Sequence, residues 1–384
     1  MYPGRPFFYE LGKRRLFMHI GLIIGTRPEA IKMAPVYMEL VARGYQVSII
    51  ATAQHRQMLD QALRLFGLKP DIDLNTMTER QSLSTLTSRL CHSLGEVFER
   101  NPYDCVLVQG DTTSTFVGAL TAFYHKIPVG HVEAGLRTSN RYDPFPEEIN
   151  RRLATQLSSY HFAPTAYSRE LLLKEQIDPS KVFVTGNTVI DALQWVIRHK
   201  RAEMETIRNQ YALDDGPYLL VTLHRRENWG EKMERVCHSL LRVLNACPEL
   251  RVFFPVHLNP RVREIVFPIL QNHPRVILSD PVEYLDFVGL MAGSKIILSD
   301  SGGIQEEAPS LGKPVLVLRE TTERPEAVEA GTALLTGTDP DRIYACIMTL
   351  LNDRERYDRM SKIANPFGSG DASKNIVDVI GSTP

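Results

Sequence analysis

Short apolar runs rich in β-branched residues alternate with amphipathic stretches along most of the chain. This alternation is typical of parallel α/β folds. Strands are predicted at 19–24, 47–51, 105–109, 128–132, 161–164 and 182–186, and then at 218–223, 251–256, 275–278, 295–298, 314–319 and 333–337. Each half of the sequence is therefore predicted to form a doubly wound, Rossmann-like sheet.

The chain length supports two domains, because 384 residues exceed the usual size of a single hydrophobic core. We place an N-terminal domain at 18–186 and a C-terminal domain at 187–366, with the linker and the start of the second domain in the polar segment 185–195. A Pro-Phe-Gly break precedes a last helical segment at 367–384. Residues 1–17 precede the first predicted strand and form an N-terminal extension without a recognisable function.

Composition and charge restrict the class of partner. The formal net charge of −1 gives no overall attraction to nucleic acid or to an anionic membrane, so an anionic ligand needs locally placed cations. The five cysteines lack any CxxC pair, which is typical of reduced thiols in the cytoplasm. No apolar run is long enough to span a bilayer, and the N-terminus lacks the apolar core of a signal peptide. We expect a cytoplasmic protein that binds neither nucleic acid nor membrane.

The turn after the predicted strand 295–298 has the features of a phosphate site. It contains Ser301, Gly302 and Gly303, and a helical pattern begins directly behind them. Glycines let backbone N–H groups approach a ligand, and a helix N-terminus adds unpaired donors and a positive dipole end. An ordinary βαβ turn is the alternative explanation for these residues taken alone.

The residues that follow this turn favour a nucleotide-sugar ligand. Glu306 and Glu307 lie one turn further on, where a carboxylate can accept hydrogen bonds from both hydroxyls of a ribose. The next predicted strand, 314–319, brings Arg324 to the same carboxyl edge of the sheet. Phosphate donors, a ribose acceptor and an arginine within one short span predict a nucleotide-sugar site rather than a simple turn.

The first strand ends in a different kind of turn. Gly21 and Gly25 do not have the spacing of a GxGxxG dinucleotide motif, so no NAD is expected. Pro28 favours a helix start and directs Arg27 to its mouth, with Lys32 one turn later. We predict a cationic site for a leaving diphosphate; surface charges on a first helical turn are the alternative.

Acidic residues follow the next predicted strands of the first half. Asp111 precedes a helix, where it is either a functional carboxylate or an N-cap. Glu133 and Glu147 are predicted to face the cleft between the domains, where a carboxylate can exchange protons with a substrate. Glu148 could equally be a helix-surface residue paired with Arg151 or Arg152.

Two histidines end strands in the second half. His224 stands beside two arginines in the segment HRREN, which favours contact with a phosphate or a sugar over a purely structural role. His257 ends the following strand, and its position alone assigns it no role. No clustered ligand spacing is visible, so no metal is expected.

Taken together, these motifs resemble the non-hydrolysing UDP-N-acetylglucosamine 2-epimerase family. The resemblance runs from Met18 to the C-terminus through GTRPEAIKMAP (25–35), GDTTST (110–115), HVEAGLRT (131–138), FPEEINR (145–151), TGNTVIDAL (185–193), HRREN (224–228) and SDSGG…EAG (299–331). It implies a glycosyltransferase-B-like fold with an interdomain cleft, a homodimer, and a last helix that crosses back to the N-terminal domain. It also implies UDP and UDP-N-acetylglucosamine as ligands and no cofactor.

The resemblance assigns roles by motif position. It implies active-site roles for Arg27, Lys32, Asp111, Glu133, Glu147 and His224. It places Phe287 beside the uracil and implies UDP binding by Ser301, Gly302, Gly303, Glu307 and Arg324. A regulatory site for a second UDP-sugar is matched by Gln54, Gln57, Arg80 and His257.

The chemistry of the substrate selects a mechanism. The hydrogen on carbon 2 of N-acetylglucosamine is not adjacent to a carbonyl carbon, so direct removal as a carbanion is implausible. Expulsion of UDP from carbon 1 acidifies carbon 2 and leads through 2-acetamidoglucal to the mannosamine epimer. The product would serve cell-surface polysaccharide synthesis. A glycosyltransferase of the same architecture, a hydrolysing epimerase and a silent UDP-sugar sensor are the alternatives; the presence of the carboxylates favours the epimerase.

Overall fold

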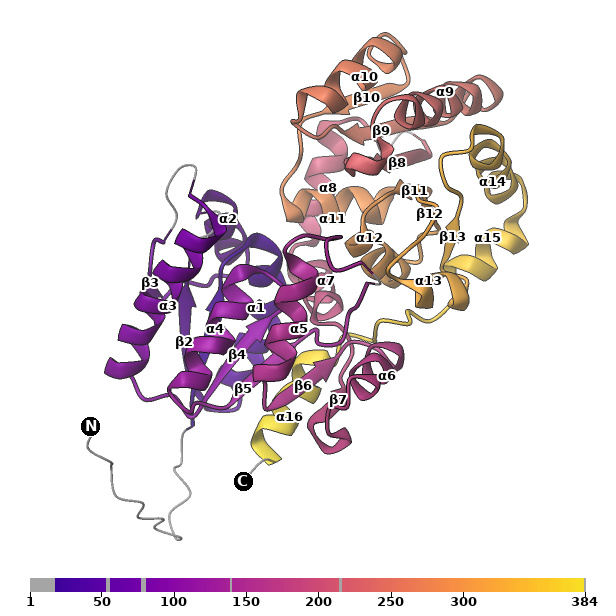
Figure 1. The fold of residues 1–384 in the computed structure, drawn as a ribbon. Helices are drawn as coiled ribbons and strands as arrows, with labels where there is room; N and C mark the ends of the chain where they lie inside the picture. The colour runs from indigo at the N-terminus through magenta and orange to yellow at the C-terminus, as the bar shows by residue number, and fades with distance from the viewer. Residues whose placement is uncertain (1–17, 53–55, 77–80, 139, 214–215, 383–384) are drawn as a thin grey trace, which may run out of the picture.

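The computed structural model describes residues 18–52, 56–76, 81–138, 140–213 and 216–382, which form two parallel-sheet α/β domains (Figure 1). The first sheet has the order β3–β2–β1–β4–β5–β6–β7 and comprises β1 (His19–Ile24), β2 (Gln46–Ala51), β3 (Ile72–Asp73), β4 (Cys105–Gln109), β5 (Val129–Val132), β6 (Tyr160–Ala163) and β7 (Val182–Val184). The second has the order β10–β9–β8–β11–β12–β13 and comprises β8 (Tyr218–Thr222), β9 (Arg251–Pro255), β10 (Val276–Ser279), β11 (Ile296–Ser299), β12 (Val315–Val317) and β13 (Ala333–Leu335).

These strands confirm the predicted ones, with ends that differ by up to two residues. The additional strand is β3, which has two residues and no apolar run of its own, so the sequence pattern does not reveal it. All strand pairs among the described residues are parallel. The predicted pair of doubly wound sheets is therefore confirmed.

Helices cover both faces of each sheet. The first domain contains α1 (Arg27–Ala42), α2 (Arg56–Leu65), α3 (Leu83–Arg100), α4 (Thr113–Tyr124), α5 (Glu147–Leu157) and α6 (Ala166–Lys174). The remainder of the chain contains α7 (Thr188–His199), α8 (Arg201–Gln210), α9 (Glu231–Ala246), α10 (Pro260–Leu270), α11 (Tyr284–Gly293), α12 (Gly302–Glu307), α13 (Pro325–Ala330), α14 (Pro340–Asn352), α15 (Arg354–Ser361) and α16 (Ala372–Ser382). No helix in this described part of the chain combines the length and apolar character that a membrane span requires.

The two-residue period of the strands explains these layers. In β4, Cys105 and Leu107 belong to a core shared with α1 and α7, whereas Val106 and Val108 pack with α3 and α4 on the opposite face. The first of these cores continues into the second domain, where it includes Leu220 of β8. Because one apolar cluster reaches both sheets, their carboxyl edges are held facing each other.

Helix α7 forms the connection that the sequence analysis treats as a linker. It starts one residue after Asn187, whose side chain accepts a hydrogen bond from the Val189 N–H at 3.0 Å, and it packs against α1, α11 and α12. Residues 185–187 form the short connection, and the rest of the segment 185–195 belongs to α7, whose apolar residues are buried in the shared core.

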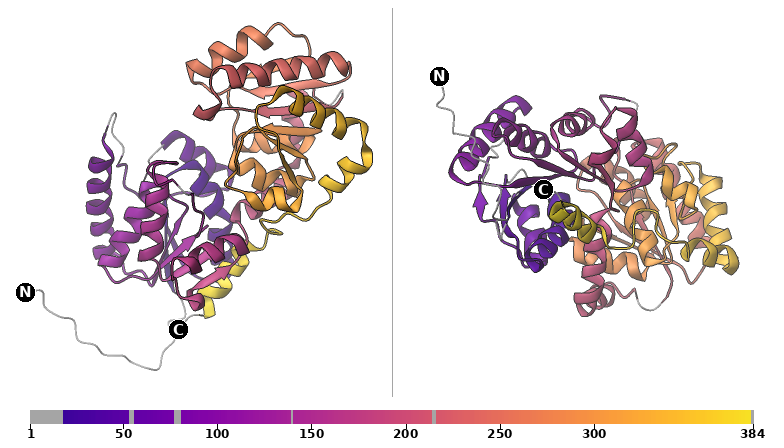
Figure 2. Two further views of the ribbon diagram at one scale, coloured as in Figure 1. Left: turned by 45° about the vertical axis from the view of Figure 1, so that its right-hand side comes forward. Right: turned by 90° about the horizontal axis from the view of Figure 1, so that it is seen from below.

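The last helix returns to the first domain. Helix α16 packs against α1 and α7 (Figures 1 and 2). Asp191 of α7 accepts hydrogen bonds from the backbone N–H of Ala372 at 3.2 Å and of Ser373 at 2.8 Å, at the start of α16. The end of the chain is thus tied to the helix between the two domains.

Candidate active site

A cleft of about 570 Å³ lies where the carboxyl edges of the two sheets meet. Its lining comes from both domains: Arg27, Pro28, Ile31, Lys32, Val189, Thr222, Leu223, His224, Pro255, His257, Pro281, Val282, Tyr284, Phe287, Ser301, Gly303, Ile304, Glu306, Glu307 and Arg324. Ligands of open α/β sheets bind at this edge. The cleft therefore brings together predicted residues that are far apart in the sequence.

The turn between β1 and α1 places the first two cations. Arg27 is the first residue of α1 and Pro28 the second, as predicted. Glu29 completes a capping box with Thr26, and it also accepts a hydrogen bond from the Thr112 hydroxyl at 2.6 Å. Burial raises the pKa of Glu29 to about 7, although the hydrogen bonds from Thr112 and from the turn oppose this. The first turn is thereby attached to the one that carries Asp111.

Lys32 and Glu133 form an ion pair on the N-terminal side of the cleft. The Lys32 ammonium lies 2.6 and 2.7 Å from the two carboxylate oxygens, and the side-chain amides of Gln109 and Asn187 also donate to Glu133. Burial alone would raise the pKa of Glu133, but Lys32, Arg324 and the hydrogen bonds outweigh it and lower that pKa. Glu133 is therefore held as a buried carboxylate.

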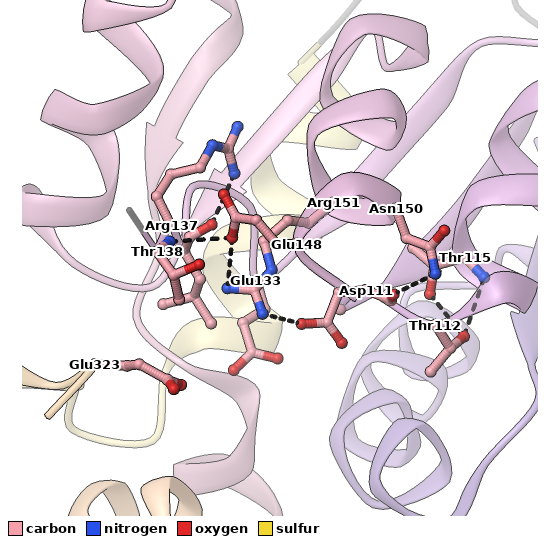
Figure 3. A network of polar contacts seen from close by, with 12 residues as sticks. Asp111, Thr112, Thr115, Glu133, Arg137, Thr138, Glu148, Asn150, Arg151 and Glu323 are labelled. Atoms are coloured by element: carbon pink, nitrogen blue, oxygen red, sulfur yellow. Dashed lines mark hydrogen bonds and ion pairs between the residues drawn. The ribbon is translucent and has the colours of Figure 1, made fainter. Parts of the chain in front are cut away.

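Asp111 is held by an arginine and is not a helix cap. The N-cap of α4 is Thr112, whose hydroxyl accepts from the Thr115 N–H, while the Asp111 carboxylate lies 2.6 Å from Arg151 (Figure 3). Burial raises the pKa of Asp111; Arg151 lowers it, and the neighbouring carboxylates of Glu133 and Glu147 add to the rise. The functional alternative for Asp111 is the one that this geometry favours.

The two adjacent glutamates of α5 have different environments. Glu147, the first residue of α5, is partly exposed and close enough to Asp111 to affect its titration. Glu148 is 0% exposed and accepts hydrogen bonds from the Thr138 N–H at 3.0 Å and from Arg152 at 2.7 Å. The prediction of a helix-surface position for Glu148 is therefore wrong, although its pairing with an arginine of the same helix is right.

The glycine turn of the second domain lies across the cleft from these carboxylates. Ser301 is the N-cap of α12, and Gly302 and Gly303 are its first two helical residues. The first N–H groups of a helix have no partner within it and point outward with the positive end of the dipole. A Cβ on Gly302 would lie 3.6 Å from the Arg324 guanidinium, so the arginine sits directly against the turn.

The two glutamates after this turn are divided between two partners. Glu306 is 1% exposed, accepts a hydrogen bond from Arg324 and lies 3.9 Å from Lys32 of the other domain. Glu307 instead accepts a hydrogen bond from the Tyr284 hydroxyl at 2.6 Å. Burial raises the pKa of Glu307 to about 7, and the Tyr284 hydrogen bond opposes that rise. The sequence did not separate their roles; the structure commits Glu306 to the cations.

The predicted histidines share one wall of the cleft. His224 follows β8, and its ring centroid lies 6.1 Å from that of His257 in a stacked arrangement. The Nδ1 atom of His224 lies 3.0 Å from Asp300, which also accepts from the backbone N–H groups of His224 and Arg225. Burial opposes ionisation of Asp300, but His224 and the backbone donors lower its pKa. Asp300 therefore fixes the ring of His224.

The structure describes only part of the predicted regulatory site. Gln54 and Arg80 lie outside the described residues, as does the side chain of Gln57, whereas His257 lines the main cleft. A second cavity of about 400 Å³ opens beside α2 and shares Arg27 and Tyr284 with the main cleft.

Sequence reasoning missed several residues of the site. They are Gln109, Arg151, Asn187, Tyr284, Asp300 and Glu323. Asp300 could have been predicted from the sequence, because it directly follows β11 and precedes the glycine turn. Gln109 could have been predicted in the same way, because it ends β4. Glu323 lies 3.5 Å from Arg225, 3.6 Å from Arg319 and 3.7 Å from Arg324, and no sequence pattern predicts these contacts; Figure 3 shows it beside the network around Asp111.

The side chains around the cleft do not form a metal-ligand cluster among the described residues. The described part of the chain contains no group of three or more His, Cys, Asp or Glu side chains placed to hold a metal ion. The positive charges around the cleft come instead from Arg27, Lys32, Arg151 and Arg324, three of which lie against a carboxylate. What this arrangement offers is a set of cations suited to an anion, placed next to buried carboxylates.

Known proteins share this architecture. The family model described as UDP-N-acetylglucosamine 2-epimerase matches residues 39–381. The UDP-N-acetylglucosamine 2-epimerase of Escherichia coli strain K12 is 50% identical over 370 residues, covering 94% of this chain and 98% of that protein. The enzyme of the same name from Bacillus subtilis strain 168 is 51% identical over 357 residues, covering 93% of each.

Solved structures agree with these matches. The crystal structure of UDP-GlcNAc 2-epimerase from Neisseria meningitidis bound to UDP-GlcNAc has a TM-score of 0.89 and 50% identity, covering 95% of this chain and all of that one. The Methanocaldococcus jannaschii UDP-GlcNAc 2-epimerase in complex with UDP-GlcNAc and UDP has a TM-score of 0.80 and 34% identity over the same shares. This chain, with its two facing sheets and the carboxylate-lined cleft between them, belongs to the UDP-N-acetylglucosamine 2-epimerase family.

Proposed function

We propose that this protein interconverts UDP-N-acetylglucosamine and UDP-N-acetylmannosamine by inversion at carbon 2, without net hydrolysis. One observation carries the proposal: Glu133 is ion-paired with Lys32, which lines the cleft together with Arg27, Arg324 and the glycine turn, and Asp111 lies near enough to Lys32 and Glu133 for their charges to affect its pKa. A plain UDP-binding protein needs the cations and the glycine turn alone. An epimerase needs the carboxylates as well.

The proposed route begins with departure of UDP from carbon 1. The negative charge that develops on the diphosphate is stabilised by Arg27, His224, Arg324 and the first N–H groups of α12. A base then takes the proton from carbon 2, which the departure has made acidic, to give 2-acetamidoglucal. Protonation of the opposite face of carbon 2 and return of UDP to carbon 1 complete the inversion, with every atom of the substrate retained.

Asp111, Glu133 and Glu147 supply the acids and bases. Two different groups are needed, because the proton leaves one face of carbon 2 and returns to the other. The environments of Asp111 and Glu133 support such a division: burial raises the pKa of Asp111, whereas Lys32 and Arg324 overcome burial and lower that of Glu133. Opposite shifts of neighbouring carboxyl pKa values are characteristic of acid–base pairs.

The same proposal includes the assembly and regulation that the resemblance implies. We infer a cytoplasmic homodimer that supplies UDP-N-acetylmannosamine to cell-surface polysaccharide synthesis. A second UDP-N-acetylglucosamine would bind at Gln54, Gln57, Arg80 and His257 and activate the enzyme. The prediction is a sigmoidal dependence of rate on substrate concentration, with loss of the sigmoidal shape in Arg80→Ala; sedimentation equilibrium would report the dimer.

No NAD and no metal enter the proposed route. Cations of the protein stabilise the diphosphate, so activity should survive extensive treatment with EDTA and should not depend on added NAD. Activity that disappears with EDTA and returns with Mg²⁺ would contradict this part of the proposal.

Identification of the products tests the function directly. Purified protein is incubated with UDP-N-acetylglucosamine alone, and the mixture is followed by proton NMR. A stable mixture with UDP-N-acetylmannosamine is the expected result. Free N-acetylmannosamine plus UDP would instead indicate a hydrolysing epimerase. An unchanged substrate with intact UDP binding would indicate a glycosyltransferase that lacks its acceptor, or a UDP-sugar sensor.

A further inference from the structure

Helix α11 presents two aromatic side chains to the cleft, Tyr284 and Phe287. Residues three apart share a face of a helix, so both rings point to the same side of the site. Phe287 matches the position that packs beside the uracil. Tyr284 lies one turn closer to the start of the helix, and the resemblance gives it no role.

Tyr284 is bonded to a carboxylate of the nucleotide side of the cleft. Its hydroxyl donates to Oε1 of Glu307 at 2.6 Å, the length of a charge-assisted hydrogen bond. Burial, followed by the nearby Glu307 charge, raises the pKa of Tyr284 well above its usual value, so the phenol keeps its proton and acts as a donor. No hydrogen bond to Oε2 of Glu307 is formed by the described residues, and that oxygen remains available.

Glu306 does not compete for this role. Its side chain is 1% exposed, it accepts from Arg324, and Lys32 lies 3.9 Å away. Its Oε2 accepts no hydrogen bond from the described residues, but loss of the Glu306 charge would leave the buried Arg324 without its main carboxylate partner, which is costly. Of the two carboxylates behind the glycine turn, Glu307 is therefore the one free to accept from a sugar hydroxyl.

We infer that Tyr284 is a positioning residue that holds one oxygen of Glu307 and directs the other to the ribose hydroxyls of the nucleotide. The residue thereby sets the preference for a ribonucleotide over a 2′-deoxyribonucleotide. This inference rests on the proposed function, because it assumes UDP in the cleft with its ribose at Glu307.

The same hydrogen bond keeps Glu307 in its accepting state. The pKa of Glu307 is about 7, and the Tyr284 hydroxyl lowers it against the larger effect of burial. Loss of the hydroxyl therefore raises this pKa further and reduces the ionised fraction at neutral pH. At pH 8.5 the carboxylate is regained, so part of the affinity returns. A loss of packing alone would not depend on pH.

The test compares Tyr284→Phe with the wild type by calorimetric titration of UDP and of 2′-deoxy-UDP at pH 7 and pH 8.5. A hydrogen bond to a charged group contributes about 1.5–3 kcal/mol, so wild type should prefer UDP by about 10–100-fold. In Tyr284→Phe the preference should fall to within about threefold at pH 7 and should partly recover at pH 8.5. The ratio of variant to wild type at each pH removes the titration of the ligand itself.

Two further variants make the result specific. Tyr357→Phe removes a hydroxyl that donates to the Lys295 carbonyl at 3.0 Å, outside the cleft of the same domain, and should leave both affinities unchanged. In a Glu307→Gln background, Tyr284→Phe should have almost no further effect, because its partner has lost its charge.

The outcomes separate the inference from the function on which it rests. Unchanged UDP selectivity in Tyr284→Phe, with tight UDP binding by wild type, overturns the inference and leaves the proposed function intact. An equal loss of affinity for both nucleotides at both pH values overturns it as well, since that result describes packing. Absence of UDP binding in wild type would contradict the proposed function itself.

Discussion

The two carboxyl edges that face the cleft are built from the same strand-turn-helix unit but treat their carboxylates differently. On the N-terminal edge, Glu133 and Asp111 each lie 2.6 Å from a cation, Lys32 and Arg151. On the C-terminal edge, Glu306 is likewise paired with Arg324, but Glu307 is held by the neutral phenol of Tyr284. Ionic partners keep buried carboxylates charged, which suits proton transfer. A neutral partner orients an acceptor for hydroxyl groups, which suits ligand binding.

The edges also affect each other across the cleft. Arg324 belongs to the second domain, yet it helps to lower the pKa of Glu133 in the first. Lys32 of the first domain lies 3.9 Å from Glu306 of the second. A departing diphosphate would interact with the same cations that hold these carboxylates. Charge development on UDP and the basicity of Glu133 are therefore coupled.

The largest expected effect is on the N-terminal edge. Glu133→Gln should lower kcat by ~10²–10⁴-fold, because it removes a group that exchanges a proton with carbon 2. The UDP affinity should not weaken, since the lost charge is negative and Lys32 is left free to attract the diphosphate. Steady-state kinetics with calorimetric titration of UDP measures both quantities.

A control for this variant is Glu39→Gln, which removes a carboxylate paired with Arg43 on the partly exposed face of α1. Its kcat should stay within about twofold of wild type, as for most surface substitutions. A Glu133→Gln enzyme with nearly normal kcat would erase the distinction between the two edges.

The next effect concerns stability on the C-terminal edge. Arg324→Met leaves the buried Glu306 carboxylate without its main partner, so the free energy of unfolding should fall by about 3–5 kcal/mol. Replacing both residues, as Arg324→Met/Glu306→Met, should recover most of that stability but not the UDP affinity. Chemical denaturation together with UDP titration separates these effects. Full recovery of UDP binding in the double variant would show that Arg324 serves the fold rather than the ligand.

The pH dependence of stability gives a smaller effect. The pKa of Glu307 is raised from 4.5 to about 7 on folding, so the folded state binds the extra proton and the stabilisation is lost as pH rises between these values. Between pH 5 and pH 7.5 this group should lower the free energy of unfolding by about 1–3 kcal/mol. Glu307→Gln should remove that part of the slope, as measured by urea titrations at each pH. Subtracting the wild-type values from those of the variant removes the contribution of the other titrating groups. An unchanged pH dependence in Glu307→Gln would show that the pKa of Glu307 is not raised on folding.

The smallest effect lies away from both edges. Ser373→Ala removes the hydroxyl that donates to Asp191 at 2.6 Å, while the backbone donors of α16 remain. The free energy of unfolding should fall by about 0.5–1.5 kcal/mol. The kcat and the UDP affinity should both stay unchanged, and a clear change in either would show that the end of the chain takes part in the site.

Local patterns in the sequence predicted much of this architecture, because each buried strand needs an apolar run and each helix start has its own residues. Pro28 at the start of α1 and the glycine turn before α12 are signals of this kind. The short β3 lacks such a run. The polar residues of 185–195 do not reveal that most of this segment is a buried helix, of which Asn187 is the N-cap.

The sequence did not predict which distant residues pair with each other. The sequence places Asp111 and Arg151 far apart, and only the fold shows that they form an ion pair. The burial of Glu148 depends on the packing of α5, and the different partners of Glu306 and Glu307 depend on two other elements of the second domain. The types of residue indicate the chemistry, whereas tertiary contacts decide which carboxylate is charged.

Deuterium incorporation at carbon 2 tests the central claim, that the N-terminal edge exchanges a proton while the C-terminal edge holds UDP. The enzyme is incubated with UDP-N-acetylglucosamine in deuterium oxide and followed by proton NMR. The account predicts UDP-N-acetylmannosamine with deuterium at carbon 2, and its near absence with Glu133→Gln. Epimerisation that retains the original carbon-2 hydrogen would contradict the account, because no carboxylate of the cleft would then exchange that proton with solvent.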